Sequence, residues 1–201
     1  MTAEKLLGQT PSQTVGPYFA YALTAPQYGY DHTGIGTGGR MADEAVPGEH
    51  ITLIGRVLDG GGDPVDDALI EIWQADCEGR YAHPADRRGS NAAFAGFGRL
   101  GTGTDPERRF LFHTIKPGRV DADQAPHLNV IVFMRGLLSH LYTRIYFGDE
   151  AAANESDPVL RSVPSERRDT LLAQREETAA APIYRFDIRL QGDSETVFFD
   201  L

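Results

Sequence analysis

The segment at residues 51–73, ITLIGRVLDGGGDPVDDALIEIW, decides the fold class of this chain. Apolar residues alternate through Ile51, Leu53 and Val57 and again through Ile70 and Ile72, and the turn-rich sequence DGGGDPVDD separates the two runs. Alternation with a period of two is typical of a strand with one buried face, and Gly and Pro between two such runs favour a tight turn. The segment therefore predicts a β-hairpin, a unit that many β-sandwiches without enzymatic activity also contain.

The rest of the chain continues this pattern in short runs that are rich in aromatic and β-branched residues. These runs predict strands at residues 110–115, 128–134, 141–147, 184–190 and 196–199. One short helix is expected near residues 164–178, where Pro164 suits a first turn and Leu171 and Leu172 supply a narrow apolar stripe. Many short strands predict a mainly β protein, a two-sheet β-sandwich with long loops.

The first quarter of the chain has a different composition. Residues 8–49 are rich in Gly, Pro, Tyr and Thr and have no sustained period of 2 or 3.6. We therefore expect an irregular N-terminal arm with loops at residues 1–49, followed by one sandwich domain at residues 50–201. Residues 17–30 carry several aromatic side chains, which predicts that the arm forms an interface.

Charge and cysteine content limit the partners and the compartment. The formal net charge is −10, so the long-range field repels nucleic acid and anionic membranes, and an anionic ligand needs a local cation. Cys77 is the only cysteine, which fits a reducing cytosol. We see no secretory leader and no apolar run of the ~20 residues that a membrane span needs, so a cytoplasmic location is expected.

Five segments occur in a fixed order: PSQTVGPYF, EIWQADCEGRYAHP, GFGRLGTGTDPERRFLFHTIKPG, APHLNVIVFMRG and LYTRIYFGDE. Together they resemble the intradiol ring-cleavage dioxygenases, over almost the whole chain. The resemblance implies an oxidoreductase that inserts both atoms of O2 between the vicinal hydroxyl-bearing carbons of an aromatic ring. With 3,4-dihydroxybenzoate as the substrate, the product is 3-carboxy-cis,cis-muconate.

The resemblance also implies a centre in which two Tyr and two His hold non-haem Fe(III), because phenolate oxygens suit ferric iron. The first Tyr corresponds to Tyr81 and the first His to His127, but the second Tyr corresponds to Val120 and the second His to Asn129. Valine has no donor atom, and an amide is a poor ligand for iron. The Arg that the family places three residues before the first His is Gln124 here. We therefore predict that these positions are vestigial and that this chain holds no metal.

A chain of this type would act with a partner. The resemblance implies that an iron-bearing β chain supplies Fe(III), in a higher-order αβ oligomer, and that the α chain lends substrate-binding residues to it. The matching positions are Thr14, Gly16, Pro17 and Tyr18 in TVGPY and Arg135 in FMRG. Gly16 and Pro17 let the backbone approach a flat ring, and the Arg135 guanidinium suits a carboxylate or a phenolate.

Spacing supports the assignment of Arg135 to another chain. If residues 127–135 form one strand at ~3.3 Å per residue, His127 and Arg135 are roughly 26 Å apart. Arg135 then cannot serve the vestigial positions of its own chain.

Two other functions remain open from the sequence. The first is a non-enzymatic β-sandwich module that binds a ligand or a protein, which only the predicted hairpin supports. The second is a self-sufficient metalloenzyme that uses Tyr81, His127 and a displaced ligand such as His113. The histidines other than His127 show no metal-ligand spacing and are interpreted as ordinary residues: His32, His50, His83, His113 and His140.

Overall fold

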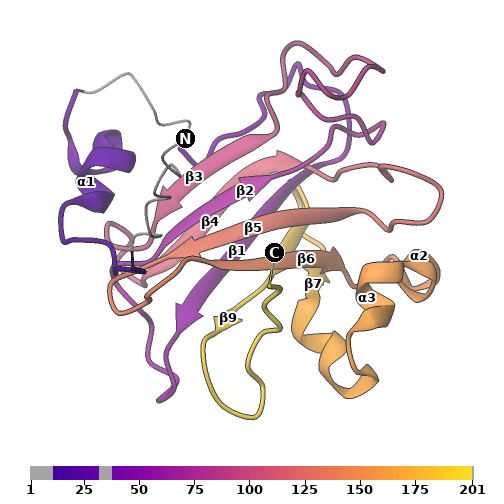
Figure 1. Cartoon of the computed structure of the whole chain (residues 1–201). Coiled ribbons are helices and arrows are strands. Elements are labelled where there is room, and N and C mark those ends of the chain that lie inside the picture. The colour runs from indigo at the N-terminus through magenta and orange to yellow at the C-terminus, as the bar shows by residue number, and fades with distance from the viewer. Residues whose placement is uncertain (1–10, 32–37, 201) are drawn as a thin grey trace, which may run out of the picture.

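The computed structural model describes residues 11–31 and 38–200, and within them nine β-strands form a two-layered structure (Figure 1). The strands are β1 (His50–Leu58), β2 (Leu69–Trp73), β3 (Phe97–Gly101), β4 (Arg109–Ile115), β5 (His127–Phe133), β6 (Leu141–Phe147), β7 (Leu172–Glu176), β8 (Ile183–Arg185) and β9 (Ile188–Arg189). The helices are α1 (Phe19–Leu23), α2 (Ala151–Ser156) and α3 (Pro158–Ser162), with 3-10 helices η1 (Ala25–Tyr28) and η2 (Ser165–Leu171). In Figure 1, α1 lies on the opposite side of the strands from α2 and α3.

Two sheets make the layers. The larger sheet has the strand order β3-β2-β5-β6, and the smaller has β8-β1-β4 with β9 beside β1. Strand β7 pairs with β6 in parallel and with β8 in antiparallel orientation, so it joins the two sheets. The prediction of a mainly β, two-sheet sandwich is confirmed.

The core lies between the two sheets. Alternate side chains of β1 and β4, such as Leu53 and Phe112, meet alternate side chains of β2 and β5, such as Ile72 and Val132, and these four are fully buried. Burial of this apolar surface is the main stabilising contribution, at roughly 25 cal/mol per Å². The strands predicted at residues 110–115, 128–134 and 141–147 are confirmed to within one residue at each end.

The predicted hairpin between β1 and β2 is wrong. The turn does close at its tip, where Leu58 bridges Pro64 and the Val65 amide donates to the Val57 carbonyl at 2.8 Å. However, β1 pairs with β4, β8 and β9, whereas β2 pairs with β3 and β5 in the other sheet. Two strands that face one core from opposite sides show the same alternation as two paired strands, so the pattern alone could not separate them.

The helix predicted at residues 164–178 is also wrong in most of its length. Pro164 precedes the 3-10 helix η2, and the chain then continues as strand β7. Leu171 and Ala173 are both fully buried, which is the period of a strand. Pairing of β7 with both sheets outweighs the local helix propensity of this segment.

Two further strand predictions need correction. The strand predicted at residues 184–190 is divided into β8 and β9, because the Asp187 side chain accepts the Arg56 amide at 2.9 Å and interrupts the ladder. Residues 196–199 form no strand and make one isolated bridge, between Phe199 and Tyr142. Strand β3, with the glycine-rich sequence FGRLG, was missed.

The described part of the arm packs on the sandwich. The Gln27 side chain donates to the Gly101 carbonyl at 3.1 Å and accepts the Gly101 amide at 2.7 Å, at the end of β3. The Met41 amide donates to the His113 carbonyl at 2.8 Å. The division of the chain at residue 49 stays a prediction, and His32 lies outside the described residues. Within the described ranges, no helix is long and apolar enough to cross a membrane.

Candidate functional site

Two of the four vestigial positions lie at the start of β5. His127 and Asn129 are two residues apart and face away from the core, while Leu128 between them is fully buried in it. In the register of the larger sheet, Asn129 is paired with Trp73 of β2 and with Arg144 of β6. We call Tyr81, Val120, His127 and Asn129 the ligand-position cluster.

Tyr81 meets Asn129 from the loop that follows β2. The Asn129 Nδ2 donates to the Tyr81 hydroxyl at 3.0 Å and to the Trp73 carbonyl at 3.3 Å. The Tyr81 ring is stacked on the Trp73 ring, with centroids 5.7 Å apart and an angle of 15°. Burial raises the pKa of Tyr81, although the hydrogen bond from Asn129 and the charge of Arg144 act in the opposite direction. The phenol is therefore neutral at physiological pH.

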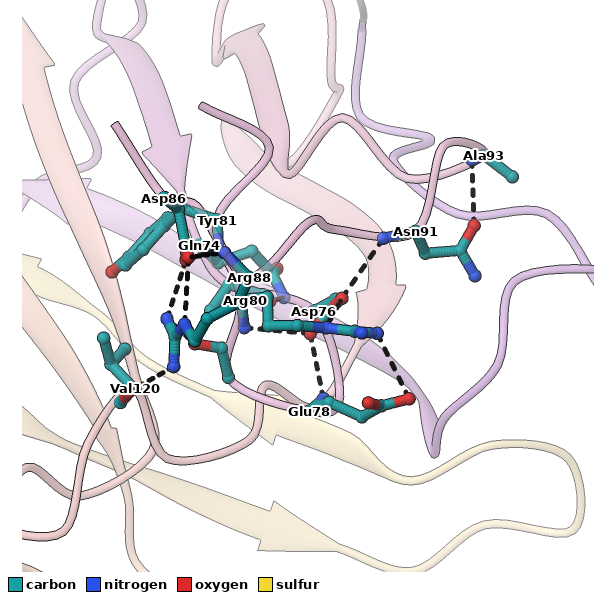
Figure 2. A network of polar contacts seen from close by, with 12 residues as sticks. Gln74, Asp76, Glu78, Arg80, Tyr81, Asp86, Arg88, Asn91, Ala93 and Val120 are labelled. Atoms are coloured by element: carbon teal, nitrogen blue, oxygen red, sulfur yellow. Dashed lines mark hydrogen bonds and ion pairs between the residues drawn. The ribbon is translucent and has the colours of Figure 1, made fainter. Parts of the chain in front are cut away.

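Val120 reaches the cluster because two loops pack closely. Gly79 has a φ of +76°, and a Cβ there would lie 1.8 Å from the Arg119 carbonyl oxygen. Arg88 links the same two loops, because its guanidinium donates to the carbonyl oxygens of Val120 and Gly79, each at 2.8 Å. Figure 2 shows Arg88 between Val120 and Asp86, with which it forms an ion pair at 2.7 Å. The Val120 carbonyl oxygen thus accepts from this chain's own guanidinium.

The Asp86 carboxylate connects that ion pair to Tyr81. Its Oδ2 accepts the Tyr81 amide at 2.9 Å (Figure 2). The hydrogen bond from the Arg88 side chain and the bond from the Tyr81 amide hold the pKa of Asp86 well below its usual range. Backbone and side chain of Tyr81 are therefore both held by the chain itself.

His127 is almost fully buried beside Tyr146. Its Nδ1 lies 2.8 Å from the Ala125 carbonyl oxygen, and because a carbonyl only accepts, Nδ1 carries the proton. Burial lowers the pKa of His127, and the positive charge of Arg144 lowers it further. The imidazole is therefore neutral at physiological pH.

Arg144 is the residue of this region that sequence reasoning missed. Gln124 stands where the family pattern has an Arg, so the sequence motif offers no cation at that position. The structure supplies one from β6: the Arg144 Nη1 donates to the Gln124 Oε1 at 3.1 Å. Its position opposite Asn129 was the available signal, but that position depends on the β5–β6 register.

The cluster does not fit ferric iron. Of the four side chains, the Val120 isopropyl group has no donor atom and the Asn129 amide is engaged with Tyr81 and Trp73. Among residues 11–31 and 38–200, no three His, Cys, Asp or Glu side chains gather as a metal site. The alternative with His113 as a displaced ligand finds no support, because His113 is exposed on β4 of the smaller sheet and bonds Thr52 at 3.1 Å.

A second group of predicted residues lies beyond the other end of β5. The Thr14 hydroxyl accepts the Gly136 amide at 2.8 Å, which ties the arm to the turn that follows Arg135. Pro17, Tyr18 and Arg135 line one depression of about 370 Å³. We call Thr14, Gly16, Pro17, Tyr18 and Arg135 the arm cluster. The structure thus brings the arm residues to Arg135 and keeps them apart from the ligand-position cluster.

The arm cluster is open to solvent. The Arg135 side chain is 54% exposed, and its Nε forms an ion pair with the Asp67 carboxylate. Tyr18 is 77% exposed, and a Cβ added to Gly16 would meet no atom within 4 Å. Asp67, which orients Arg135, was not anticipated from the sequence.

Tyrosine rings surround this depression. The Tyr21 ring contacts the rings of Tyr18, Tyr28 and Tyr30, with centroids 6.2, 4.5 and 6.2 Å apart. Tyr18, Tyr21 and Tyr30 are exposed, as is Leu138 in the neighbouring β5–β6 loop. Exposed aromatic side chains gathered in this way are typical of a protein interface.

Comparison with known proteins defines the class. A family model described as "Dioxygenase" matches residues 23–192. The chain is 55% identical to the protocatechuate 3,4-dioxygenase alpha chain of Burkholderia cepacia over 197 residues, which is 97% of this chain and 98% of that one. It is 38% identical to the beta chain of the same enzyme from Burkholderia cepacia over 162 residues, 74% of this chain and 67% of that one. The chain therefore belongs to the intradiol ring-cleaving dioxygenase family.

Among solved structures, the dioxygenase domain of a carbohydrate-binding fusion protein from Streptomyces sp. SirexAA-E matches with a TM-score of 0.59. The match covers 92% of this chain and 99% of that one at 24% identity, and it supports the fold alone. Within the family, the identity to the alpha chain, 55%, is higher than the identity to the beta chain, 38%.

Proposed function

We propose that this chain is the iron-free α subunit of a protocatechuate 3,4-dioxygenase. It acts with an iron-bearing β subunit in a cytoplasmic αβ oligomer, which cleaves 3,4-dihydroxybenzoate with O2 to 3-carboxy-cis,cis-muconate. The Fe(III) belongs to the β subunit and supplies the oxygen chemistry there. The contribution of this chain is to complete the β subunit's substrate pocket with the arm cluster.

One observation carries the proposal: Thr14, Pro17 and Tyr18 gather around Arg135, at the end of β5 remote from the ligand-position cluster. The similarity to an alpha chain over nearly its whole length points to a β partner. A solvent-exposed cluster with aromatic side chains and a guanidinium suits a site that a second chain completes.

The role of Arg135 follows from charge. The net charge of −10 repels a benzoate anion, so a local cation is needed to attract it. Asp67 binds the Arg135 Nε and so holds the guanidinium at the depression, with the Nη atoms left for a carboxylate or a phenolate. A planar fork suits a carboxylate better than the point charge of a lysine.

The test is steady-state kinetics of the αβ complex, normalised to iron. Arg135→Ala should lower kcat/KM roughly ten- to hundredfold, and Arg135→Lys should recover part of that loss. Arg161→Ala in α3, an exposed arginine on the other side of the molecule, is the matched control and should change nothing. If Arg135→Ala keeps full kcat/KM per iron, Arg135 is a surface cation with no part in the site.

The non-enzymatic sandwich module is not favoured, because its only support was the hairpin, which the sheet topology contradicts.

A further inference from the structure

One arginine near the arm cluster has a strained backbone. Arg108 has a φ of +58°, and in the part of the chain that the structure describes it is the only residue other than glycine with a positive φ. Its amide donates to the Asp105 carbonyl at 3.0 Å, which closes the turn that leads into β4. The left-handed conformation is unfavourable for a residue with a Cβ, whereas glycine adopts it freely. The chain therefore has an arginine where a glycine would be free of strain.

The turn itself is held by other side chains. The Asp105 carboxylate accepts the amides of Glu107 and Arg109 at 2.8 and 3.1 Å. The Arg109 guanidinium forms an ion pair with the same carboxylate at 3.1 Å. None of these contacts uses the Arg108 side chain, so the shape of the turn gives no reason for an arginine at this position.

The Arg108 side chain lies at the depression of the arm cluster. It lines this depression of about 370 Å³ together with Tyr18 and Arg135. Its Nη1 donates to the Gly103 carbonyl at 3.1 Å. Gly103 in turn packs closely on Tyr28, because a Cβ at Gly103 would lie 2.7 Å from the Tyr28 hydroxyl. The guanidinium is thus anchored beside the tyrosine rings that surround the depression.

The Arg108 guanidinium has no acidic partner within the described part of the chain. The neighbouring Arg109 forms ion pairs with Asp105 and Glu107, but no carboxylate lies within ion-pair distance of Arg108. Asp66 lines the same depression without reaching it. The Arg108 Nε and Nη2 also form no hydrogen bond with the described residues. The guanidinium is therefore available for a carboxylate from outside the chain.

A polypeptide partner suits this depression better than a small free anion. The lining carries two carboxylates and two guanidinium groups, those of Asp66, Asp67, Arg108 and Arg135. It therefore has no net positive charge that would attract an anion from solution. A carboxylate on a protein is held in addition by the contacts of its own chain with exposed rings such as Tyr18.

We propose that Arg108 binds the β partner: its guanidinium forms an ion pair with an Asp or Glu side chain of the β subunit at the αβ interface. This inference rests on the proposed function and adds one specific contact to the interface of the arm. The ion pair offsets the backbone strain, and a glycine could not form it. Loss of the guanidinium leaves the partner's carboxylate unpaired, which weakens binding strongly where the pair is desolvated.

The first experiment separates binding from stability. Arg108→Ala and Arg108→Gly both remove the guanidinium, and each should raise the Kd of the αβ complex about tenfold or more in sedimentation analysis. Arg108→Gly also relieves the strain, so the Tm of its free chain should be about 2 to 4 °C above that of Arg108→Ala. A chain that is more stable and yet binds less well has lost a contact and not its fold. Arg161→Ala is the matched control and should leave the Kd unchanged.

The second experiment identifies the acidic partner directly. Arg108→Lys introduces a primary amine at this position, and a carbodiimide joins an amine to a carboxylate in contact with it. The amide forms as the carbodiimide takes up the water and becomes a urea. Mass spectrometry of the treated αβ complex should find an amide between position 108 and an Asp or Glu of the β subunit. Arg161→Lys should give no such amide.

Tyr18→Ala distinguishes this inference from the proposed function. The ion pair is wrong, and the arm interface stands, if Tyr18→Ala weakens the complex but the Arg108 variants do not. If none of these variants weakens it, the proposed use of the arm fails as well. The inference is also overturned if the amide forms only with Asp66 of the same chain. A fall in kcat/KM per iron at an unchanged Kd would overturn it too, because Arg108 would then act on the substrate.

Discussion

The two ends of β5 carry residues of opposite character. At its start, the polar groups of the ligand-position cluster form hydrogen bonds within the chain. Asn129 donates to Tyr81, and the His127 ring bonds the Ala125 carbonyl. The Val120 carbonyl accepts from Arg88. Beyond its end, the arm cluster is exposed, with the Tyr18 side chain at 77% and the Arg135 side chain at 54%. Strand β5 thus connects a region whose polar groups bond within this chain with a region whose side chains are open to solvent.

This difference agrees with the proposed role of the chain as a subunit that lends residues to a partner. Val120 and Asn129 stand at two positions where the family pattern has iron ligands, and the strand and loops that carry these positions are present. Exposed aromatic side chains are unfavourable on the surface of a free chain. Together with a guanidinium, they are typical of a surface that another chain covers.

The largest effect should follow from disturbing the loops that hold the ligand-position cluster. In Gly79→Ala, the added Cβ would lie 1.8 Å from the Arg119 carbonyl oxygen at a φ of +76°. We expect the free energy of unfolding to fall by at least about 3 kcal/mol. Gly62→Ala is the control: its φ is +88° with no atom within 4 Å, so only the backbone strain of about 1 kcal/mol is expected. Equal losses in urea denaturation would mean that the loops do not pack as described.

The next effect concerns the arm cluster and assembly with the β chain. Tyr18→Ala removes the most exposed of the arm tyrosines and should weaken the αβ complex by about 2 kcal/mol, roughly 30-fold in Kd. Sedimentation analysis of coexpressed chains measures this, and Arg161→Ala provides the reference. An unchanged Kd for the Tyr18 variant would remove the arm from the interface.

A smaller effect is a pH dependence that belongs to the buried end of β5. Burial and the charge of Arg144 lower the pKa of His127 in the folded chain, against smaller opposite effects of the hydrogen bond to Ala125 and of Asp157 and Asp121. The unfolded chain therefore binds this proton first, so the stability contribution is present above about pH 6.5 and decreases as the pH falls below it. The slope of unfolding free energy against pH between 5 and 7 should be smaller in His127→Asn. The same slope in both proteins would contradict a neutral, buried imidazole.

The smallest effect is expected at the exposed end. The Arg135–Asp67 ion pair is open to water, and exposed pairs contribute little to stability. Arg135→Ala should leave the Tm of the chain unchanged within error, while it lowers the kcat/KM of the complex. A clear fall in Tm would show that Arg135 has a structural role instead.

The sequence predicts the parts of this molecule that depend on local pattern. The alternation of β4, β5 and β6 follows from one buried face, and the absent donors at Val120 and Asn129 are visible in the letters alone. Pairing is not local. The turn after Leu58 looks like a hairpin, but its second strand enters the other sheet, and β7 looks helical until its two partners are known.

The candidate site also combines residues that local motifs identify with residues that only long-range contacts bring to it. Motif spacing identifies Tyr81, His127 and Arg135, yet the residues that act on them come from elsewhere in the chain. Arg144 reaches the ligand-position cluster through strand register, and Asp67 reaches Arg135 from a segment 68 residues away. Long-range contacts of this kind leave no periodic signal in a single sequence.

In the proposed complex, the iron of the β chain lies near the arm cluster and far from the ligand-position cluster. The direct measurement is the relaxation of a nitroxide label by that Fe(III) in the αβ complex. One label is placed by Leu138→Cys, in the exposed loop after Arg135, and the other by His83→Cys, beside Tyr81, both in a Cys77→Ser background. We expect strong relaxation enhancement at position 138 and none at position 83. Equal enhancement at both, or enhancement at position 83 alone, would contradict it.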